Sequence, residues 1–260
     1  MSSQDILKHH FSKTSSTSVL KDEWIVELET SLPLYQHLPE SLRAKLHHKI
    51  GQFICTTQFE AHEALELTEG IVLSVAAQAC ILVLNHDDIP YPDLHTIRLY
   101  PSAFESVIEQ FEDDGSITET IVKCEGEAWD DGTVLLAWDS VRNGAIDMRD
   151  GENVVLHEFA HQLDARDGDI DGVPLLENEA AYHTWAGVLG ENAADLIDRI
   201  QNGDTTVLDP YAATNPAEYF AVATETFFEK PHKLKAMRPE LYAELQNFYQ
   251  LDPCEWLDPA

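Results

Sequence analysis

The most constraining feature of this sequence is an apolar helical segment, Val154 to Leu163, that contains the pattern His-Glu-x-x-His. The two histidines, His157 and His161, are four residues apart, so they lie one turn apart on the same face of a helix. Glu158 projects from a neighbouring sector. The apolar residues around these polar side chains predict a buried helix, and buried imidazoles and carboxylates are costly unless they are paired or bound to a metal.

This spacing predicts a zinc site, with one Zn²⁺ per chain. Two imidazole nitrogens on one helical face are ordinary zinc ligands, and the adjacent carboxylate of Glu158 can reach a water at the metal. Zinc would acidify that water, and Glu158 would accept its proton during attack on a carbonyl. Other divalent ions also accept histidine and carboxylate ligands, so the pattern does not by itself fix the metal.

The charge balance excludes two classes of partner. The chain has 260 residues, with 16 basic and 47 acidic side chains and a net charge of −31. Such a surface repels nucleic acid and anionic membranes, so we expect no direct binding to either. The four cysteines form no C-x-x-C pair, and no segment resembles a leader peptide or membrane span. These features predict a cytoplasmic protein.

The hydrophobic patterns predict an α+β fold with a small mixed or antiparallel sheet and flanking helices at both ends. An N-cap at Thr68 precedes a helix, residues 71–84, that is apolar nearly all round and is expected to be central and buried. Other helices are expected at residues 41–57, 154–163, 177–200, 215–229 and 239–250. Strands are expected at residues 96–100, 117–124 and 133–138, and turns at residues 87–93, 113–115 and 202–204.

The domain organisation is expected to be simple. Residues 1–20 are polar and rich in serine and threonine, which predicts a loose N-terminal tail. Residues 21–260 are expected to form a single zincin-like peptidase domain with an N-terminal helical portion. Within it, the segment Gly126–Trp129 and the strand that includes Trp138 are candidates for an edge strand that holds a peptide backbone.

A catalytic zinc site needs a third protein ligand, and the pattern offers three candidates. Glu218 and Glu225 lie seven residues apart on one side of the helix expected at 215–229. Asp167 follows the motif at a position used by some related sites. Glu218 could equally be a capping residue, because it lies three after Asn215. The run from Asp167 to Gly172 also resembles the start of a calcium loop, but its twelfth position is Asn178 rather than glutamate, which favours an acidic turn.

A family resemblance narrows these alternatives. The runs VVLHEFAHQLDARDGDIDGVPLL, NPAEYFAVATETFF and RPELYAELQNFYQLDP resemble the Mlc titration factor A family of zinc-dependent peptidases, as do LELTEGIVLSVAAQACILVLN, IRLYPSAF and GEAW. The resemblance covers about residues 35–253. The catalytic part of that family is similar to the lethal-factor peptidase domain, a gluzincin-like fold.

The resemblance implies a role for each matching residue. His157, His161 and Glu218 would bind zinc, and Glu158 would be the general base. Tyr211, in DPYAATNPAE, matches the family's catalytic tyrosine, whose phenol would hydrogen-bond the oxyanion. We further expect Glu225 to accept a hydrogen bond from a ligand histidine.

The resemblance also implies two functions. One is aminopeptidase-type hydrolysis of short peptides. Many gluzincin aminopeptidases bind the free amine of the substrate through a G-x-M-E-N stretch, which this sequence lacks. Cleavage at chain ends and cleavage within chains therefore both stay open. The other is binding to a transcriptional repressor of sugar-uptake genes, with catalysis secondary.

Overall fold

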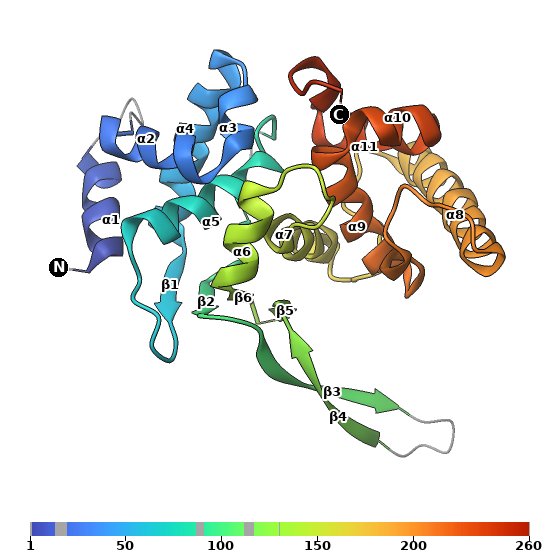
Figure 1. Cartoon of the computed structure of the whole chain (residues 1–260), viewed down its shortest axis with the longest axis horizontal. Helices are drawn as coiled ribbons and strands as arrows, with labels where there is room; N and C mark the ends of the chain where they lie inside the picture. The colour runs from blue at the N-terminus through green and yellow to red at the C-terminus, as the bar shows by residue number, and fades with distance from the viewer. Residues whose placement is uncertain (1, 14–19, 87–90, 112–116, 130, 260) are drawn as a thin grey trace.

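The computed structural model describes residues 2–13, 20–86, 91–111, 117–129 and 131–259, without the side chains of residues 108–111 and 117–119. Helices flank a small mixed sheet, which confirms the α+β class, and a β-hairpin extends away from the helices (Figure 1). The turn expected at residues 113–115, and residues 87–90 of the turn expected at 87–93, lie outside the described residues. Within the described residues, no helix combines the length and apolar character needed to cross a bilayer.

The N-terminal half supplies most of the strands. Its helices are α1 (Ser3–Lys13), α2 (Asp22–Ser31), α3 (Pro33–His37), α4 (Glu40–Thr56), α5 (Glu69–Ile81) and α6 (Trp138–Ile146). The strands are β1 (Gln58–Ala61), β2 (Thr96–Tyr100), β3 (Phe104–Phe111), β4 (Ile117–Cys124), β5 (Gly126–Trp129) and β6 (Thr133–Ala137).

The C-terminal half is helical. It comprises α7 (Val154–Asp164), η1 (Ala165–Asp167), α8 (Glu179–Asn202), η2 (Pro210–Ala213), α9 (Pro216–Glu229), α10 (Pro231–Met237), α11 (Pro239–Tyr249) and η3 (Pro253–Glu255). The helices and strands predicted from periodicity are confirmed with shifts of a few residues at their ends. The strand expected to include Trp138 ends at Ala137, and Trp138 instead begins α6.

The sheet has the order β1-β2-β6-β5. Strands β1, β2 and β6 are parallel, and β5 pairs antiparallel with β6, so β5 forms one edge of the sheet. Strands β3 and β4 form a separate antiparallel hairpin. The expected edge strand at Gly126–Trp129 is therefore present, and it lies against α7.

The N-terminal tail differs from the loose segment that the composition suggested. Residues 3–13 form α1, in which Leu7 is fully buried and Phe11 is nearly so. The Gln4 side chain donates to the Thr57 carbonyl at 2.7 Å and accepts from the Phe59 amide at 3.2 Å. Leucine and phenylalanine at helical spacing thus outweigh the polar composition and fix this helix against the N-terminal helices.

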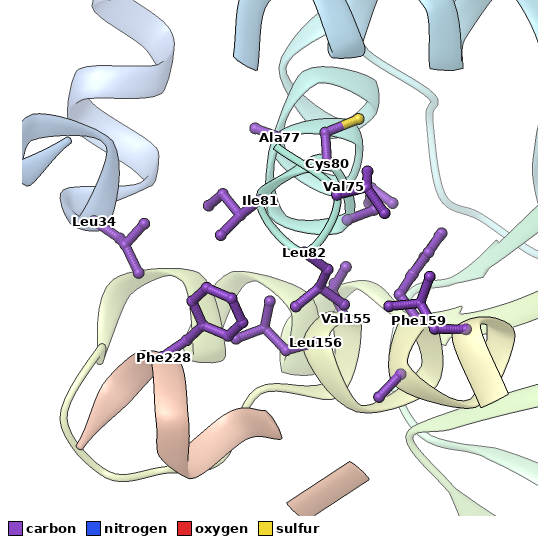
Figure 2. Packing of buried hydrophobic residues seen from close by; sticks show 14 of the residues in the cluster. Leu34, Val75, Ala77, Cys80, Ile81, Leu82, Val155, Leu156, Phe159 and Phe228 are labelled. Atoms are coloured by element: carbon purple, nitrogen blue, oxygen red, sulfur yellow. The ribbon is translucent and has the colours of Figure 1, made fainter. Parts of the chain in front are cut away.

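Helix α5 is the centre of the core. Its N-cap is Thr68, which accepts a hydrogen bond from the Ile71 amide at 3.2 Å, as predicted. Every residue from Ile71 to Ile81 is buried. Figure 2 shows Leu82, at the C-terminal end of α5, next to Val155 of α7, with Leu156 of α7 beside Phe228 of α9. Apolar contact therefore holds the motif helix against α5 along its buried face.

Candidate metal centre

Helix α7 is positioned by its N-cap, Asn153. The Asn153 side-chain oxygen accepts hydrogen bonds from the amides of Val155 and Leu156, at 3.1 and 3.0 Å. The backbone N–H of Asn153 in turn donates to Glu225 of α9, and the side-chain nitrogen of Asn153 donates to Glu229 at 3.1 Å. The start of the motif helix is thus fastened to α9. Sequence reasoning missed this role of Asn153, although an asparagine just before an apolar helical run is an N-cap signal.

Helix α9 brings Glu218 to the two histidines. Asn215 caps this helix by accepting from the Glu218 amide at 2.9 Å, and Pro216 occupies the first turn. The Glu218 carboxylate points toward the histidines: its Oε2 lies 2.9 Å from His157 Nε2 and 3.7 Å from His161 Nε2. Although its backbone amide is capped, the Glu218 side chain faces the candidate metal site.

The three side chains have the spacing of a metal-ligand set. Their ligand atoms all lie within 4.8 Å of one another, and the two Nε2 atoms are 3.2 Å apart. On a tetrahedral zinc ion with ligands at roughly 2.0–2.1 Å, two ligand atoms would be about 3.3 Å apart. Glu218 Oε2 is buried and has no partner with hydrogen-bond geometry, despite its short approach to His157. A divalent cation shared by the three atoms would satisfy it, so these residues fit zinc.

The other two candidates for the third ligand lie elsewhere. Glu225 Oε1 is 2.8 Å from His157 Nδ1, on the side of the imidazole away from Glu218. Glu225 therefore orients His157 from behind. Asp167 is exposed and accepts from the amide of Asp169 at 3.2 Å, in the turn that follows α7. Of the residues that the structure describes, His157, His161 and Glu218 form the one group spaced to hold a metal ion, so the acidic turn at 167–172 has no such group.

The electrostatics of this centre favour a bound cation. Burial lowers the pKa of His157, but the carboxylates of Glu218 and Glu225 outweigh burial and raise that pKa to about 10. Burial would raise the pKa of Glu218, yet its histidine neighbours lower it to about 2. Glu218 is therefore a carboxylate at neutral pH, and surroundings that favour a proton on His157 also favour a metal ion there.

The side chain of Glu158 extends from α7 toward the edge strand β5. It is 7% exposed, and burial raises the pKa of its carboxyl to about 7 although His157 and His161 act in the opposite direction. Strand β5 approaches so closely that a Cβ atom on Gly126 would come within 2.5 Å of Glu158 Oε1. The glycine permits this contact. No sequence signal identified this contact, because the two residues are far apart in the chain.

Tyr211 lies at the open side of the centre. It belongs to η2, where Asp209 accepts from its amide at 2.8 Å. Its ring centroid is 6.1 Å from that of His157, and the side chain is 54% exposed. Burial raises the pKa of the Tyr211 phenol, and the charges of Glu218 and Glu158 raise it further, so the hydroxyl keeps its proton at neutral pH. The structure thus brings all five predicted side chains to one place.

Comparison with known proteins shows the family to which the chain belongs. The family model described as glucose-regulated metallo-peptidase M90 matches residues 7–250. An uncharacterized Synechocystis protein is 41% identical over 90% of this chain and 86% of its own length. Mlc titration factor A of Klebsiella pneumoniae is 34% identical over 88% of this chain and 86% of its own length. Mlc titration factor A of Pectobacterium atrosepticum is 32% identical, with 86% and 84% covered. The chain therefore belongs to the M90 family of metallopeptidases.

Proposed function

We propose that this protein is a zinc-dependent peptidase of aminopeptidase type that acts on short peptides. The observation that carries the proposal is the convergence of His157, His161 and Glu218 beside the buried carboxylate of Glu158. A purely structural zinc site is normally closed by four protein ligands and has no use for a base. Three ligands with a carboxylate alongside are typical of a catalytic site.

His157, His161 and Glu218 would hold the metal, and Glu225 would fix the tautomer of His157 by accepting from its Nδ1. When bound, zinc supplies Lewis acidity, which polarises the scissile carbonyl and acidifies water. Glu158 would take the proton from the attacking water and pass it to the leaving amine. A base whose pKa lies near neutral pH is well matched to both transfers.

Two further groups would act on the substrate. The Tyr211 hydroxyl, protonated at neutral pH, would donate to the oxygen that becomes negative as the carbonyl turns tetrahedral. The free edge of β5 lies next to Glu158, where its backbone could pair with an extended peptide. A cationic peptide amino terminus would also be attracted by the strongly negative charge of the protein.

The test is hydrolysis of aminoacyl and internally quenched peptides by wild type and by Glu158→Gln, with zinc measured in both. We expect the variant to keep its zinc and to lose activity by about 10²–10⁴-fold. Preferential cleavage of aminoacyl substrates would support the aminopeptidase assignment. An active Glu158→Gln protein would rule out the assigned base.

A second function is favoured by the names of the relatives. Several of them are called Mlc titration factor A, and we propose that this chain also binds a transcriptional repressor of sugar-uptake genes. Its acidic surface would compete for the basic DNA-binding face of such a protein. Release of purified Mlc from its operator by both wild type and Glu158→Gln would show that binding is separate from catalysis; no release by either would refute this function.

We also propose a cytoplasmic location without direct contacts to nucleic acid or membrane. All four cysteines are free thiols, and Cys55 is exposed, which suits a reducing compartment. Fractionation of cells that express the protein would test this location, and its recovery in the membrane fraction would contradict it.

A further inference from the structure

A cationic cavity is lined by residues of α3, α10 and the C-terminal segment, which Figure 1 shows at the opposite end of the molecule from the β3–β4 hairpin. It has a volume of about 450 Å³. Its walls come from the end of α3, the loop after α6, the start of α10 and the C-terminal segment. Basic side chains lining it include His37, Arg149, Lys230 and Lys233. This concentration of cations is notable because the whole chain carries a net charge of −31.

Among the described residues, none of these cations forms an ion pair with a carboxylate. Elsewhere, Arg98, Arg199 and Lys235 form ion pairs with acidic side chains at 2.8 to 3.2 Å. By contrast, no ion pair involves Arg149 or Lys233 within the part of the chain that the structure describes, and both are exposed. Like charges held together repel each other, so an anion would relieve a cost that the folded protein carries.

Two acidic residues, Glu229 and Asp258, also line the cavity, and the three cations Arg149, Lys230 and Lys233 outnumber them. Both oxygens of Glu229 are engaged on its inner side: one accepts from the Gly151 amide at 3.0 Å and the other from Asn153 Nδ2 at 3.1 Å. Asp258 is exposed and, among the described residues, belongs to no ion pair. Lys230 donates to the carbonyl of Asp150, which leaves two of its three donors for a ligand.

Apolar side chains form another part of the cavity surface. Met148, Pro231 and Leu257 contribute to its lining, and Pro231 and Leu257 are buried. Its volume falls within the range of roughly 300–1,000 Å³ that is usual for small-molecule sites, and it exceeds what one oxyanion would fill. The lining therefore suits a ligand with a doubly charged anionic group and an apolar body.

We infer that this cavity is a binding site for a small phosphate monoester, separate from the metal centre. The phosphate group would lie between Arg149, Lys230 and Lys233, and the apolar part of the ligand against Met148, Pro231 and Leu257. A phosphate dianion is favoured over a carboxylate because its second negative charge and third terminal oxygen let it contact all three of these cations at once. His37 could add a further donor at the rim.

The test is isothermal titration calorimetry of the zinc-loaded protein at constant ionic strength. The probes are phenyl phosphate, inorganic phosphate and benzoate. We expect saturable binding of phenyl phosphate with one site per chain, and weaker binding of the other two. The double variant Arg149→Gln, Lys233→Gln should lose about tenfold or more in affinity, while Lys123→Gln, on the distant hairpin, should bind as wild type does.

Three outcomes would overturn the inference. The first is the absence of saturable binding of phenyl phosphate at millimolar concentrations. The second is unchanged affinity in the double variant, above all if His161→Ala abolishes binding, because the anion would then lie at the metal centre. The third is equal affinity for benzoate, which would exclude phosphate selectivity. Arg149 and Lys233 are exposed and outside the core, so their replacement leaves the fold intact, which thermal unfolding would verify.

Discussion

The contact between Gly126 and Glu158 makes a sharp prediction for Gly126→Ala. An alanine Cβ would lie 2.5 Å from Glu158 Oε1, 2.6 Å from Glu158 Cγ and 2.6 Å from Val154 Cγ2. Carbon atoms in contact are normally about 3.5–4.0 Å apart, so the added methyl overlaps all three by about 1 Å. Hydrogen bonds to β6 hold β5 in place, and Val154 is a stiff β-branched residue on α7. The Glu158 side chain is therefore the group that must move.

The size of the effect follows from that displacement. Overpacking of a buried contact costs about 1–3 kcal/mol of stability, which for a chain of this length lowers Tm by roughly 2–12 °C. A displacement of about 1 Å at a catalytic group costs on the order of 10²-fold in rate. We therefore expect kcat/KM to fall by about 100-fold, whereas zinc content stays at one per chain because the three atoms nearest to the added methyl belong to Glu158 and Val154 and not to the candidate ligands.

Peptidase assays, zinc analysis and thermal unfolding would be compared for wild type, Gly126→Ala and a matched control. The control is Gly187→Ala on α8, where an added Cβ meets nothing within 4 Å. Because that glycine lies inside a helix, we expect the control to gain about 0.5–1 kcal/mol and to keep full activity. Wild-type activity and stability in Gly126→Ala would refute the packing of β5 against Glu158.

Three further predictions concern metal binding and pH. The Glu225 carboxylate contacts two N–H groups, of Asn153 and His157, and in Glu225→Gln one of these groups loses its acceptor. Zinc affinity, measured by chelator competition, should therefore fall about 10–100-fold. An unchanged affinity would contradict the orienting role of Glu225. His161→Ala should abolish the rise in Tm on adding zinc, because that rise reflects binding to the folded state alone, and a persistent rise would place the ion elsewhere. Burial raises the pKa of Asp252, but the Tyr242 hydroxyl and Lys235 outweigh burial and hold it below its usual value. Wild type should therefore be more stable than Asp252→Asn by a constant amount above about pH 5, and the difference should shrink as pH falls below about 4; a difference that grows on acidification would refute this.

The convergence of His157, His161 and Glu218 could be predicted from the sequence because its signals are local. The motif sets the relative placement of His157 and His161 through helical geometry alone. Thr68 marks the start of α5, and Asn215 marks the start of α9. Glu218 was a harder choice. A glutamate after an asparagine cap has a local explanation, and the pattern alone did not exclude Glu225 or Asp167.

Features that depend on long-range packing escaped sequence reasoning. Strand β1 is a short piece held beside β2, and α1 is stabilised by contacts to α4 and the residues that follow it. Strand β1 has no strong periodic signal of its own, and the polar composition around α1 obscured the helical spacing of Leu7 and Phe11. The same is true of Gly126 and of the cavity lined by Arg149, whose members come from separate elements. Such sites exist only once the chain has folded.

Helix α9 supplies three groups to the centre: the candidate third ligand Glu218, the Glu225 carboxylate next to His157 Nδ1, and Glu229, which accepts from Asn153. This has a consequence for the order of events during synthesis. About 60 residues separate His161 from Glu218, so a ribosome that adds roughly 5–20 residues per second exposes the motif several seconds before α9 is made. Throughout that interval the nascent chain has two histidines but no complete centre. Metal acquisition is therefore a late step, and a chain cut before residue 216 would keep its His-Glu-x-x-His motif yet have no site to fill.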